Sequence, residues 1–465
     1  MEEGERPRSK LYIMEPLLRR LPEVEIPKRH VPFKEKFMWT GIVLLVFLVM
    51  TQIPLYGMIK EVEPFFGRLQ YVLASHAGTI VELGIGPIVT AGIIMQLLAG
   101  SKLVNLDMSK PDDRALFTGV QKVLAVAVAI FEASMMVLGG HYGSIADLGV
   151  GRAVFLVAQL VLGSVIVLYL DELVSKFGFG SGISLFIAAG VTATIFWQAF
   201  NPIEALGFGA VPNFIRAVIS GSSDQIYDAF FRQNLPNMMG FFAMIAVFFI
   251  VVYAESMRVE IPLAYGQYGG LRGRYPIKLL YTSVIPVILA SMIFMNLRIF
   301  AGLLQRWGFP LLGTFDERGH PISGVVYYLN SPNGIQDVLA DPLRAIVYLS
   351  VLILLCVGFS YLWIYMTGMG PKEVAEQLDR SGMLIPGFRR DIRVMESVLD
   401  RYIKAVTFIS GAFIAVLSAL ADFTGAIGSG TGVLLTVSII YGLYQEIARE
   451  QVVEMFPVMR RFLGE

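Results

Sequence analysis

Few residues in this 465-residue chain are of types that could support catalysis or metal binding. Its single cysteine, Cys356, excludes an internal disulfide and a multi-cysteine metal site. The four histidines are scattered, and no H-E-x-x-H motif is present. Glu132 lies within an apolar segment, but one such carboxylate is a thin basis for ion-coupled transport, and we expect it to pair with a polar neighbour. We therefore predict no catalytic residue, no metal and no cofactor, and expect that the chain is not an enzyme.

Branched apolar residues offer a different kind of chemistry. Four of these residues form two pairs, and the two members of each pair are four positions apart, so they share one helix face. Two further residues hold the equivalent positions in the second copy of an internal repeat, which is described below. The six residues are Ile85, Val89, Ile183, Ile187, Ile288 and Leu435. If they converge at mid-membrane they form an apolar ring, which wets poorly when narrow and so resists small ions. The alternative is an ordinary packed core.

These residues lie in a chain with the composition of a membrane protein. It is 55% hydrophobic and only 16% charged, whereas soluble domains are about one quarter charged. A spanning helix needs about 20 mostly apolar residues, and the absence of period-two alternation argues against a barrel. We predict ten spanning helices at 37–59, 80–101, 118–138, 153–170, 181–200, 238–257, 276–298, 344–368, 402–421 and 431–448.

The charges are balanced in number but sorted by position. Lys plus Arg and Asp plus Glu each total 37, which argues against a protein that coats nucleic acid. The basic residues concentrate in alternate connecting segments, and cytoplasmic segments are the ones enriched in Lys and Arg. We predict a multi-pass protein of the cell membrane with both termini in the cytosol.

Two pairs of predicted helices share a local pattern. The helices containing Pro87 and Pro286 agree at the positions two, four and five residues after the proline. The Gly-Ser-Gly sequences 180–182 and 428–430 precede the fifth and tenth helices. A repeat of five spans is odd in number, so its copies have opposite orientations. We predict an all-α membrane protein with two inverted five-helix halves around a pore; chance similarity of apolar helices, and prolines that merely kink them, are the alternatives.

Several of these stretches resemble the SecY family, the pore-forming subunits of the Sec translocon, in the style of its archaeal members. The motifs lie at 83–98, 178–184, 268–278, 371–373 and 381–389, in the family's order and spacing. The resemblance covers nearly the whole chain and also extends to the alpha subunit of the endoplasmic-reticulum channel. It implies a channel that moves unfolded polypeptides across the membrane and releases transmembrane segments sideways into lipid. A secondary transporter with an inverted repeat is the alternative function.

The resemblance also implies roles for particular residues. It places the six residues named above in the pore ring, with Leu435 the least secure because Leu434 is adjacent. A plug helix maps to about 61–72, and a lateral gate includes Gln121 and Asn296. The apolar stripe of the plug is formed by Phe65, Phe66, Leu69 and Val72. A re-entrant helix packed only for stability is the alternative for that stripe.

The resemblance further implies partners. Arg272, Arg274 and Arg389 lie on two cytosolic tips that dock the ribosome in the family, although they could serve only as inside-positive topology signals. Other expected partners are small single-span subunits of the SecE/gamma and beta types, signal sequences, nascent polypeptides and the lipid bilayer. No nucleotide-binding loop is present, so a partner is expected to supply the energy.

The expected organisation follows from these assignments. It consists of a cytosolic segment 1–36, a first half 37–200 with its plug at about 61–72, an external hinge loop 201–237, a second half 238–448 with cytosolic loops 258–278 and 369–401, and a cytosolic tail 449–465.

Overall fold

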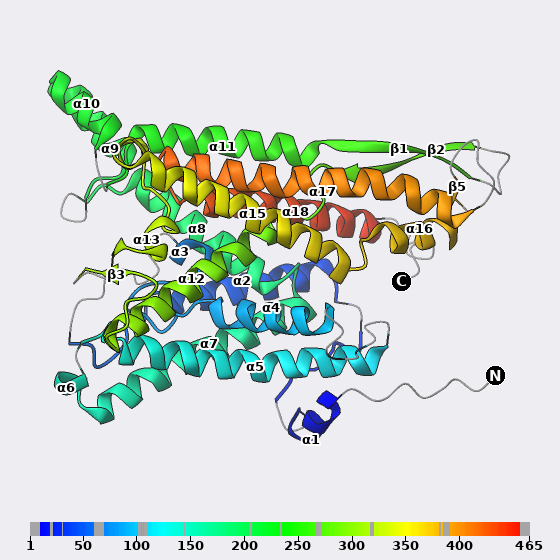
Figure 1. Cartoon of the computed structure of the whole chain (residues 1–465), viewed down its shortest axis with the longest axis horizontal. Coiled ribbons are helices and arrows are strands. Elements are labelled where there is room, and N and C mark those ends of the chain that lie inside the picture. Colours follow the sequence, from blue (N-terminus) through cyan, green and yellow to red (C-terminus); the bar gives the residue numbers. More distant parts are fainter. Residues whose placement is uncertain are drawn as a thin grey trace. The chain divides into compact units, whose positions relative to one another are not determined.

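A computed structural model describes the chain as two compact units (Figure 1). The first unit comprises Met1–Phe196, Met292–Tyr327 and Ile439–Glu465, and the second comprises Trp197–Ser291 and Tyr328–Ser438. The structure describes residues 10–18, 22–29, 31–59, 69–100, 104, 106, 110–143, 145–203, 207–232, 235–265, 271–316, 320–380, 383–384 and 391–455.

Helices make up most of both units. Those that lie in the first unit, or begin there, are η1 (Lys10–Met14), α1 (Glu15–Leu18), α2 (Phe33–Met50), α3 (Leu69–Val72), α4 (Gly86–Gly100), α5 (Pro111–Leu138), α6 (Ile145–Leu148), α7 (Val150–Phe177), α8 (Gly182–Phe200) and α13 (Val325–Tyr328). The second unit holds α9 (Ala210–Ser220), α10 (Ser223–Phe231), α11 (Met238–Ser256), α14 (Ile335–Ala340), α15 (Pro342–Met366), α16 (Pro371–Arg380) and α17 (Ile392–Phe423). Residues of α12 (Ile285–Arg306) and α18 (Gly430–Met455) belong to both units.

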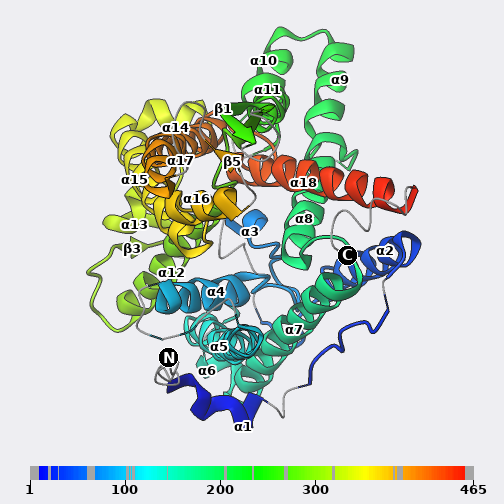
Figure 2. The ribbon, with the colours of Figure 1, turned by 90° about the vertical axis from the view of Figure 1, so that its right-hand side faces the viewer.

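Each of the ten predicted spans coincides with one long helix. Eight of these helices are long and apolar enough to cross a membrane. The other two are α2, which carries three charged residues near its start, and α4, which has only 15 residues. In the first unit α5 packs against both α4 and α7 (Figure 2). In the second unit α15 and α17 lie side by side (Figure 1).

In three predicted spans, one end of the helix falls at least six residues short of the predicted boundary. The first helix ends at Met50 instead of continuing to residue 59, and the residues that follow form turns and a bridge between Pro54 and Thr79. Helices α4 and α12 begin six and nine residues later than predicted, at Gly86 and Ile285. Pro87 and Pro286 are thus each the second residue of a helix, where the missing N–H has no cost. They start their helices and do not kink them.

The segment 258–278, predicted as a loop, is a β-hairpin. Strands β1 (Arg258–Tyr265) and β2 (Leu271–Lys278) pair antiparallel along their full lengths, and β5 (Met383–Leu384) adds to β1. Figure 1 shows the hairpin extending beyond the end of α11. Ile261 and Ile277 are buried in a cluster with residues of α15, α16 and α17, so the hairpin has its own apolar base.

A second, small hairpin lies in the first unit after α12. Strands β3 (Thr314–Phe315) and β4 (Pro321–Ser323) pair antiparallel with an irregular register. The amide side chain of Gln305 anchors this hairpin, because its Oε1 accepts from the N–H of Phe315 at 2.8 Å.

Candidate functional site

A buried segment links α3 to the start of α4 in the first unit. Val72, Leu73 and Ala74 are each 1% exposed, although α3 is only four residues long. The Ile85 N–H donates to the Leu73 carbonyl oxygen at 2.9 Å, which ties this segment to the first turn of α4. A Cβ at Gly190 of α8 would lie 3.7 Å from the Ala74 Cα. The segment therefore contacts both α4 and α8.

Gly84 is required for this arrangement. Its φ is +56°, and a Cβ there would lie 2.1 Å from the Leu73 carbonyl oxygen. We expect Gly84→Ala to lower the melting temperature of the detergent-solubilised chain, since backbone strain of this kind costs about 1–3 kcal/mol even before the clash. The matched control is Gly41→Ala in α2, where nothing lies within 4 Å of the added Cβ. A helical glycine costs about 0.5–1 kcal/mol relative to alanine, so the control should be neutral or stabilising. Equal shifts for the two variants would contradict the assignment.

The four predicted ring residues of the first unit lie at the starts of α4 and α8. Ile85 immediately precedes α4, and its carbonyl oxygen accepts from the Val89 N–H at 3.0 Å, so the two residues are one helical turn apart. Ile183 and Ile187 lie in the first two turns of α8. Ile85 and Ile187 are 0% and 1% exposed, whereas Val89 and Ile183 are half-buried.

The two predicted ring residues of the second unit also lie early in their helices. Ile288 is the fourth residue of α12 and is half-buried. Leu435 is the sixth residue of α18 and is fully buried, and Leu434 is buried as well. Each of the six residues thus lies within two turns of a helix start, or immediately before it.

The predicted plug is described only at its end. Leu69 and Val72 lie in α3, and Val72 is buried. Phe65 and Phe66 lie outside the described residues, and the surroundings of the Leu69 side chain are not described. The described part of the plug thus continues directly into the buried segment that contacts α4 and α8.

A polar cluster that the sequence did not reveal holds the segment between α3 and α4. Glu82 is 1% exposed, and its carboxylate accepts from the Tyr142 hydroxyl at 2.9 Å and from the Gly78 N–H at 3.0 Å. His141 Nε2 lies 2.8 Å from the same carboxylate. Burial, reinforced by the neighbouring Glu82, raises the pKa of Tyr142 well above its ordinary value. The cluster joins this segment to the turn that follows α5.

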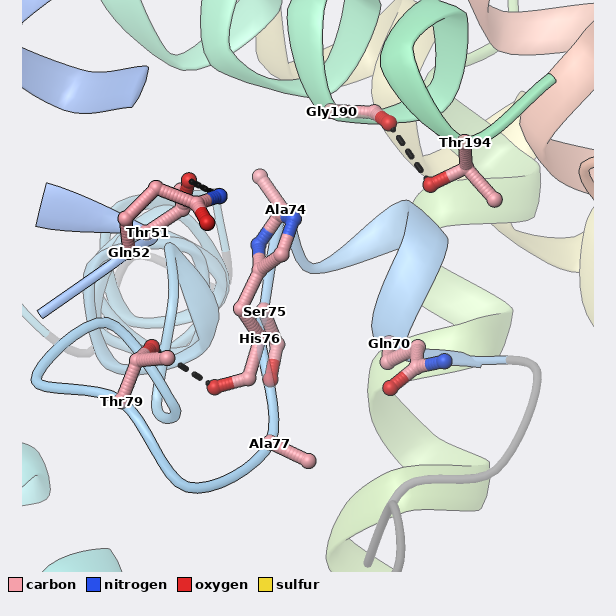
Figure 3. Close-up of a pocket in the computed structure, with 10 residues that line it drawn as sticks. All are labelled: Thr51, Gln52, Gln70, Ala74, Ser75, His76, Ala77, Thr79, Gly190 and Thr194. Carbon is pink, nitrogen blue, oxygen red and sulfur yellow. Dashed lines mark hydrogen bonds between the residues drawn. The ribbon is translucent and has the colours of Figure 1, made fainter. Parts of the chain in front are cut away.

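A polar cavity of about 280 Å³ lies beside the buried segment. It is lined by the end of α2, by α3 and residues 74–79, and by α8 (Figure 3). His76 lies among the hydroxyl and amide side chains of this cavity, and its Nδ1 has no partner among the described residues. Burial lowers the pKa of His76, so its imidazole is uncharged at neutral pH. The cavity presents hydrogen-bonding groups without a fixed charge.

The two predicted gate residues are placed on separate helices of the first unit. The Gln121 Nε2 on α5 lies 3.2 Å from the Cβ position of Gly92 on α4. The Asn296 Nδ2 on α12 donates to the Met292 carbonyl oxygen of its own helix at 2.9 Å. The Asn296 amide therefore has its partner within its own helix, and the Gln121 amide lies against the adjacent helix α4.

No polar partner of Glu132 is found within the part of the chain that the structure describes. Both carboxylate oxygens of Glu132 are buried, and neither has a hydrogen-bond partner among the described residues. A Cβ added at Gly86 would lie 3.5 Å from the Glu132 Oε2 and 3.4 Å from the Met295 Cε. Sequence reasoning identified Glu132 as intramembrane but did not reveal its proximity to the first residue of α4.

The predicted docking arginines are described in part. Arg274 lies on β2, is exposed, and forms an ion pair with Glu260 on β1, with 2.5 Å between Nη1 and Oε2. Arg272 lies on the same strand, but its side chain is not described, and Arg389 lies outside the described residues. Among the described residues, no group of three or more His, Cys, Asp or Glu side chains is placed so that it could hold a metal ion.

Eight helices that are long and apolar enough to cross a membrane, together with a buried segment packed against α4 and α8, define a multi-pass membrane protein. A SecY family profile matches residues 79–444, and a profile for the plug domain of Sec61p matches residues 45–78. The chain belongs to the SecY family.

Individual relatives agree with this family. The chain is 47% identical to the protein translocase subunit SecY of Pyrococcus furiosus, over 98% of this chain and 99% of that one. A solved structure of a protein-conducting channel is 44% identical with a TM-score of 0.83, and covers 95% of this chain and 98% of that one. Sec61 in a canine ribosome-channel complex is 43% identical with a TM-score of 0.81 and the same coverage. The chain is therefore a protein-conducting channel subunit of a translocase, and the transporter alternative is not favoured.

Proposed function

We propose that the six apolar residues form the constriction through which an unfolded polypeptide passes. The supporting observation is that all six lie within two turns of a helix start, or immediately before it, and that three are almost fully buried. A collar of aliphatic side chains offers no hydrogen bonds, so it has no sequence preference for the chain it conducts. Branched side chains swing aside and close around the chain, and a narrow apolar collar stays dry.

The segment around 61–72 is proposed to be the plug that seals the resting channel. Its described end is buried and tied by backbone to the start of α4, next to ring residue Ile85. This anchoring fixes the described end of the plug against α4. The proposal gives the channel two seals in series, the collar and the plug.

Transmembrane segments are proposed to leave sideways, through a gate that includes Gln121 and Asn296. Transfer of apolar surface from water to lipid contributes about 25 cal/mol per Å², so an apolar helix of about 20 residues partitions outward. A polar segment gains nothing from lipid and continues through the pore. Selection would thus depend on partitioning and not on a binding pocket.

A photocrosslinking experiment tests the constriction. We expect a photoreactive phenylalanine analogue at Ile187 or Leu435 to capture a translocating polypeptide arrested in the reconstituted channel. The control positions are Leu162 on α7 and Leu354 on α15, which are 60% and 71% exposed and suited to face lipid. Capture at the control positions with equal yield would exclude a specific role for the ring.

Substitution of the gate amides should have a moderate effect. Even an interhelical hydrogen bond in a membrane protein contributes only about 0.6 kcal/mol on average, and the described Asn296 bond lies within its own helix, so Gln121→Leu with Asn296→Leu should change gate opening by several-fold at most. We expect weakly apolar signal sequences to be accepted more efficiently in a reconstituted translocation assay. Gln225→Leu on exposed α10 serves as the control. A reduced acceptance of weak signals, with normal protein levels, would contradict the gate assignment.

The remaining assignments concern partners and location. We propose that small single-span SecE/gamma and beta subunits pack on this chain, and that ribosomes dock on the tips that carry Arg272, Arg274 and Arg389. Signal sequences and nascent polypeptides are the proposed substrates. The cell membrane is the proposed location, with cytosolic termini and the segment boundaries given above. The chain is proposed to act as a passive conduit and not as an enzyme, with a partner supplying the energy.

A further inference from the structure

Helices α8 and α18 begin in closely similar ways, although their first turns belong to different units. Each follows a glycine with positive φ, Gly180 at +66° and Gly428 at +81°. Each begins two residues later at a second glycine, Gly182 or Gly430. The predicted ring residues Ile187 and Leu435 both lie five residues beyond that second glycine.

In both cases the preceding helix touches the backbone of the new helix. A Cβ at Gly182 would lie 2.5 Å from the Asp171 Cα of α7. A Cβ at Gly430 would lie 2.3 Å from the Ser418 carbonyl oxygen of α17. Contacts this close exclude any side chain, so both glycines permit direct backbone packing.

An aspartate from the preceding helix then binds the first turn. The Asp171 Oδ1 accepts from the Ile183 N–H at 2.9 Å and from the Ser181 hydroxyl at 3.3 Å. The Asp422 Oδ1 accepts from the Gly430 N–H at 2.7 Å, and Asp422 is 4% exposed. First-turn N–H groups have no intrahelical partner, and carboxylates are favoured at helix N-termini.

The two contacts are not a simple consequence of the repeated sequence. Asp171 lies 11 residues before Gly182, whereas Asp422 lies eight residues before Gly430. Different spacings therefore deliver a carboxylate to the same part of the helix. At α18 the link is doubled, because the hydroxyls of Ser418 and Thr431 are 2.5 Å apart.

We propose that Asp171 and Asp422 are positioning residues that set the rotation of α8 and α18 about their axes. Successive residues of an α-helix are about 100° apart, so a slip of one residue at the cap would turn Ile187 or Leu435 by about that angle. Such a turn would remove the side chain from the face it occupies. The functional importance of this rotation rests on the proposed function of the ring residues. The rotation itself can be measured whether or not that function is correct.

A cysteine scan measures the rotation. In a Cys356→Ala background of the full chain in membranes, single cysteines are placed at 183–190 and at 431–438 and treated with a membrane-impermeant maleimide. We expect Asp171→Leu to shift the most reactive position of the first series by at least one residue. Asp171→Asn keeps an acceptor oxygen of the same geometry and should leave the pattern unchanged. Asp422→Leu and Asp422→Asn should behave in the same way for the second series.

The two series control one another. Asp171→Leu should leave the 431–438 pattern unchanged, and Asp422→Leu should leave the 183–190 pattern unchanged. If the leucine variants do not accumulate, Gly182→Ala carries the test, because its Cβ forces α8 away from Asp171 while the carboxylate remains. We expect it to shift the 183–190 pattern as Asp171→Leu does.

Unchanged cysteine-reactivity patterns in Asp171→Leu and Asp422→Leu would overturn the proposal, even if the melting temperature of these variants fell. If Gly182→Ala carries the test, an unchanged 183–190 pattern in that variant would overturn it. Equal shifts in the asparagine and leucine variants would also overturn it. Failure of the ring assignment is a separate result: the unsubstituted scan would then show a reactive face that omits Ile183 and Ile187.

Discussion

Simultaneous replacement of Ile85, Ile183 and Ile288 by serine should raise ion leakage through the resting channel by at least about tenfold in planar bilayers. Each change removes about three carbons, at about 0.8 kcal/mol per buried CH₂, or about 7 kcal/mol for the three sites. A tenfold increase in leakage requires the free-energy barrier to ion passage to fall by only about 1.4 kcal/mol, a small part of this total. The serine hydroxyls also hydrate a constriction that otherwise stays dry.

A matched triple variant separates this effect from general destabilisation. Ile94, Phe196 and Ile293 lie on α4, α8 and α12 and are 37%, 66% and 40% exposed. Their replacement by serine should leave conductance at the unsubstituted level. Comparable leakage in the two triples, or none in the ring triple, would remove the six residues from the constriction.

Charge reversal of Arg272, Arg274 and Arg389 to glutamate should weaken cosedimentation with ribosomes. The three changes replace three cations by three anions, and each lost phosphate contact is expected to lower the salt-dependence slope by about one. Measurement at two salt concentrations therefore gives both the loss of affinity and the number of contacts. Reversal of Arg216, in the predicted external hinge loop 201–237, is the control and should have no effect.

One substitution on the β1–β2 hairpin is expected to have the opposite effect on ribosome binding. Glu260 pairs with Arg274 at 2.5 Å, so a phosphate must compete with this carboxylate for the guanidinium. Glu260→Gln should therefore strengthen ribosome binding and steepen its salt dependence. Weaker binding by Glu260→Gln, or unaltered binding by the triple reversal, would count against the tips as docking sites.

The positions of the long helices could be predicted because an apolar window of about 20 residues is a strong and local signal. The starts of α4 and α12 could not, because contacts distant in sequence decide where such a helix begins. At α4 the start depends on Gly84 meeting the Leu73 carbonyl. The motifs around 83–98 and 178–184 revealed the family, but not the physical reason for their glycines.

Two kinds of structure were missed, for different reasons. In β1 the apolar residues Val259, Ile261, Leu263 and Tyr265 do alternate, but the basic residues of the segment led to its prediction as a charged loop. The Glu82 cluster consists of single polar residues from distant turns. Such groups have no periodicity, so only their meeting in three dimensions identifies them.

The base of the β1–β2 hairpin is closed by a hydrogen bond from the Leu279 N–H to the Met257 carbonyl oxygen at 3.0 Å. One residue separates α11 from β1, and six separate β2 from α12. The hairpin is therefore attached most directly to α11, through a single residue. A force applied to the strands by a bound partner would reach α11 at once, and would reach the first turn of α12, where Ile288 lies, through the six residues 279–284.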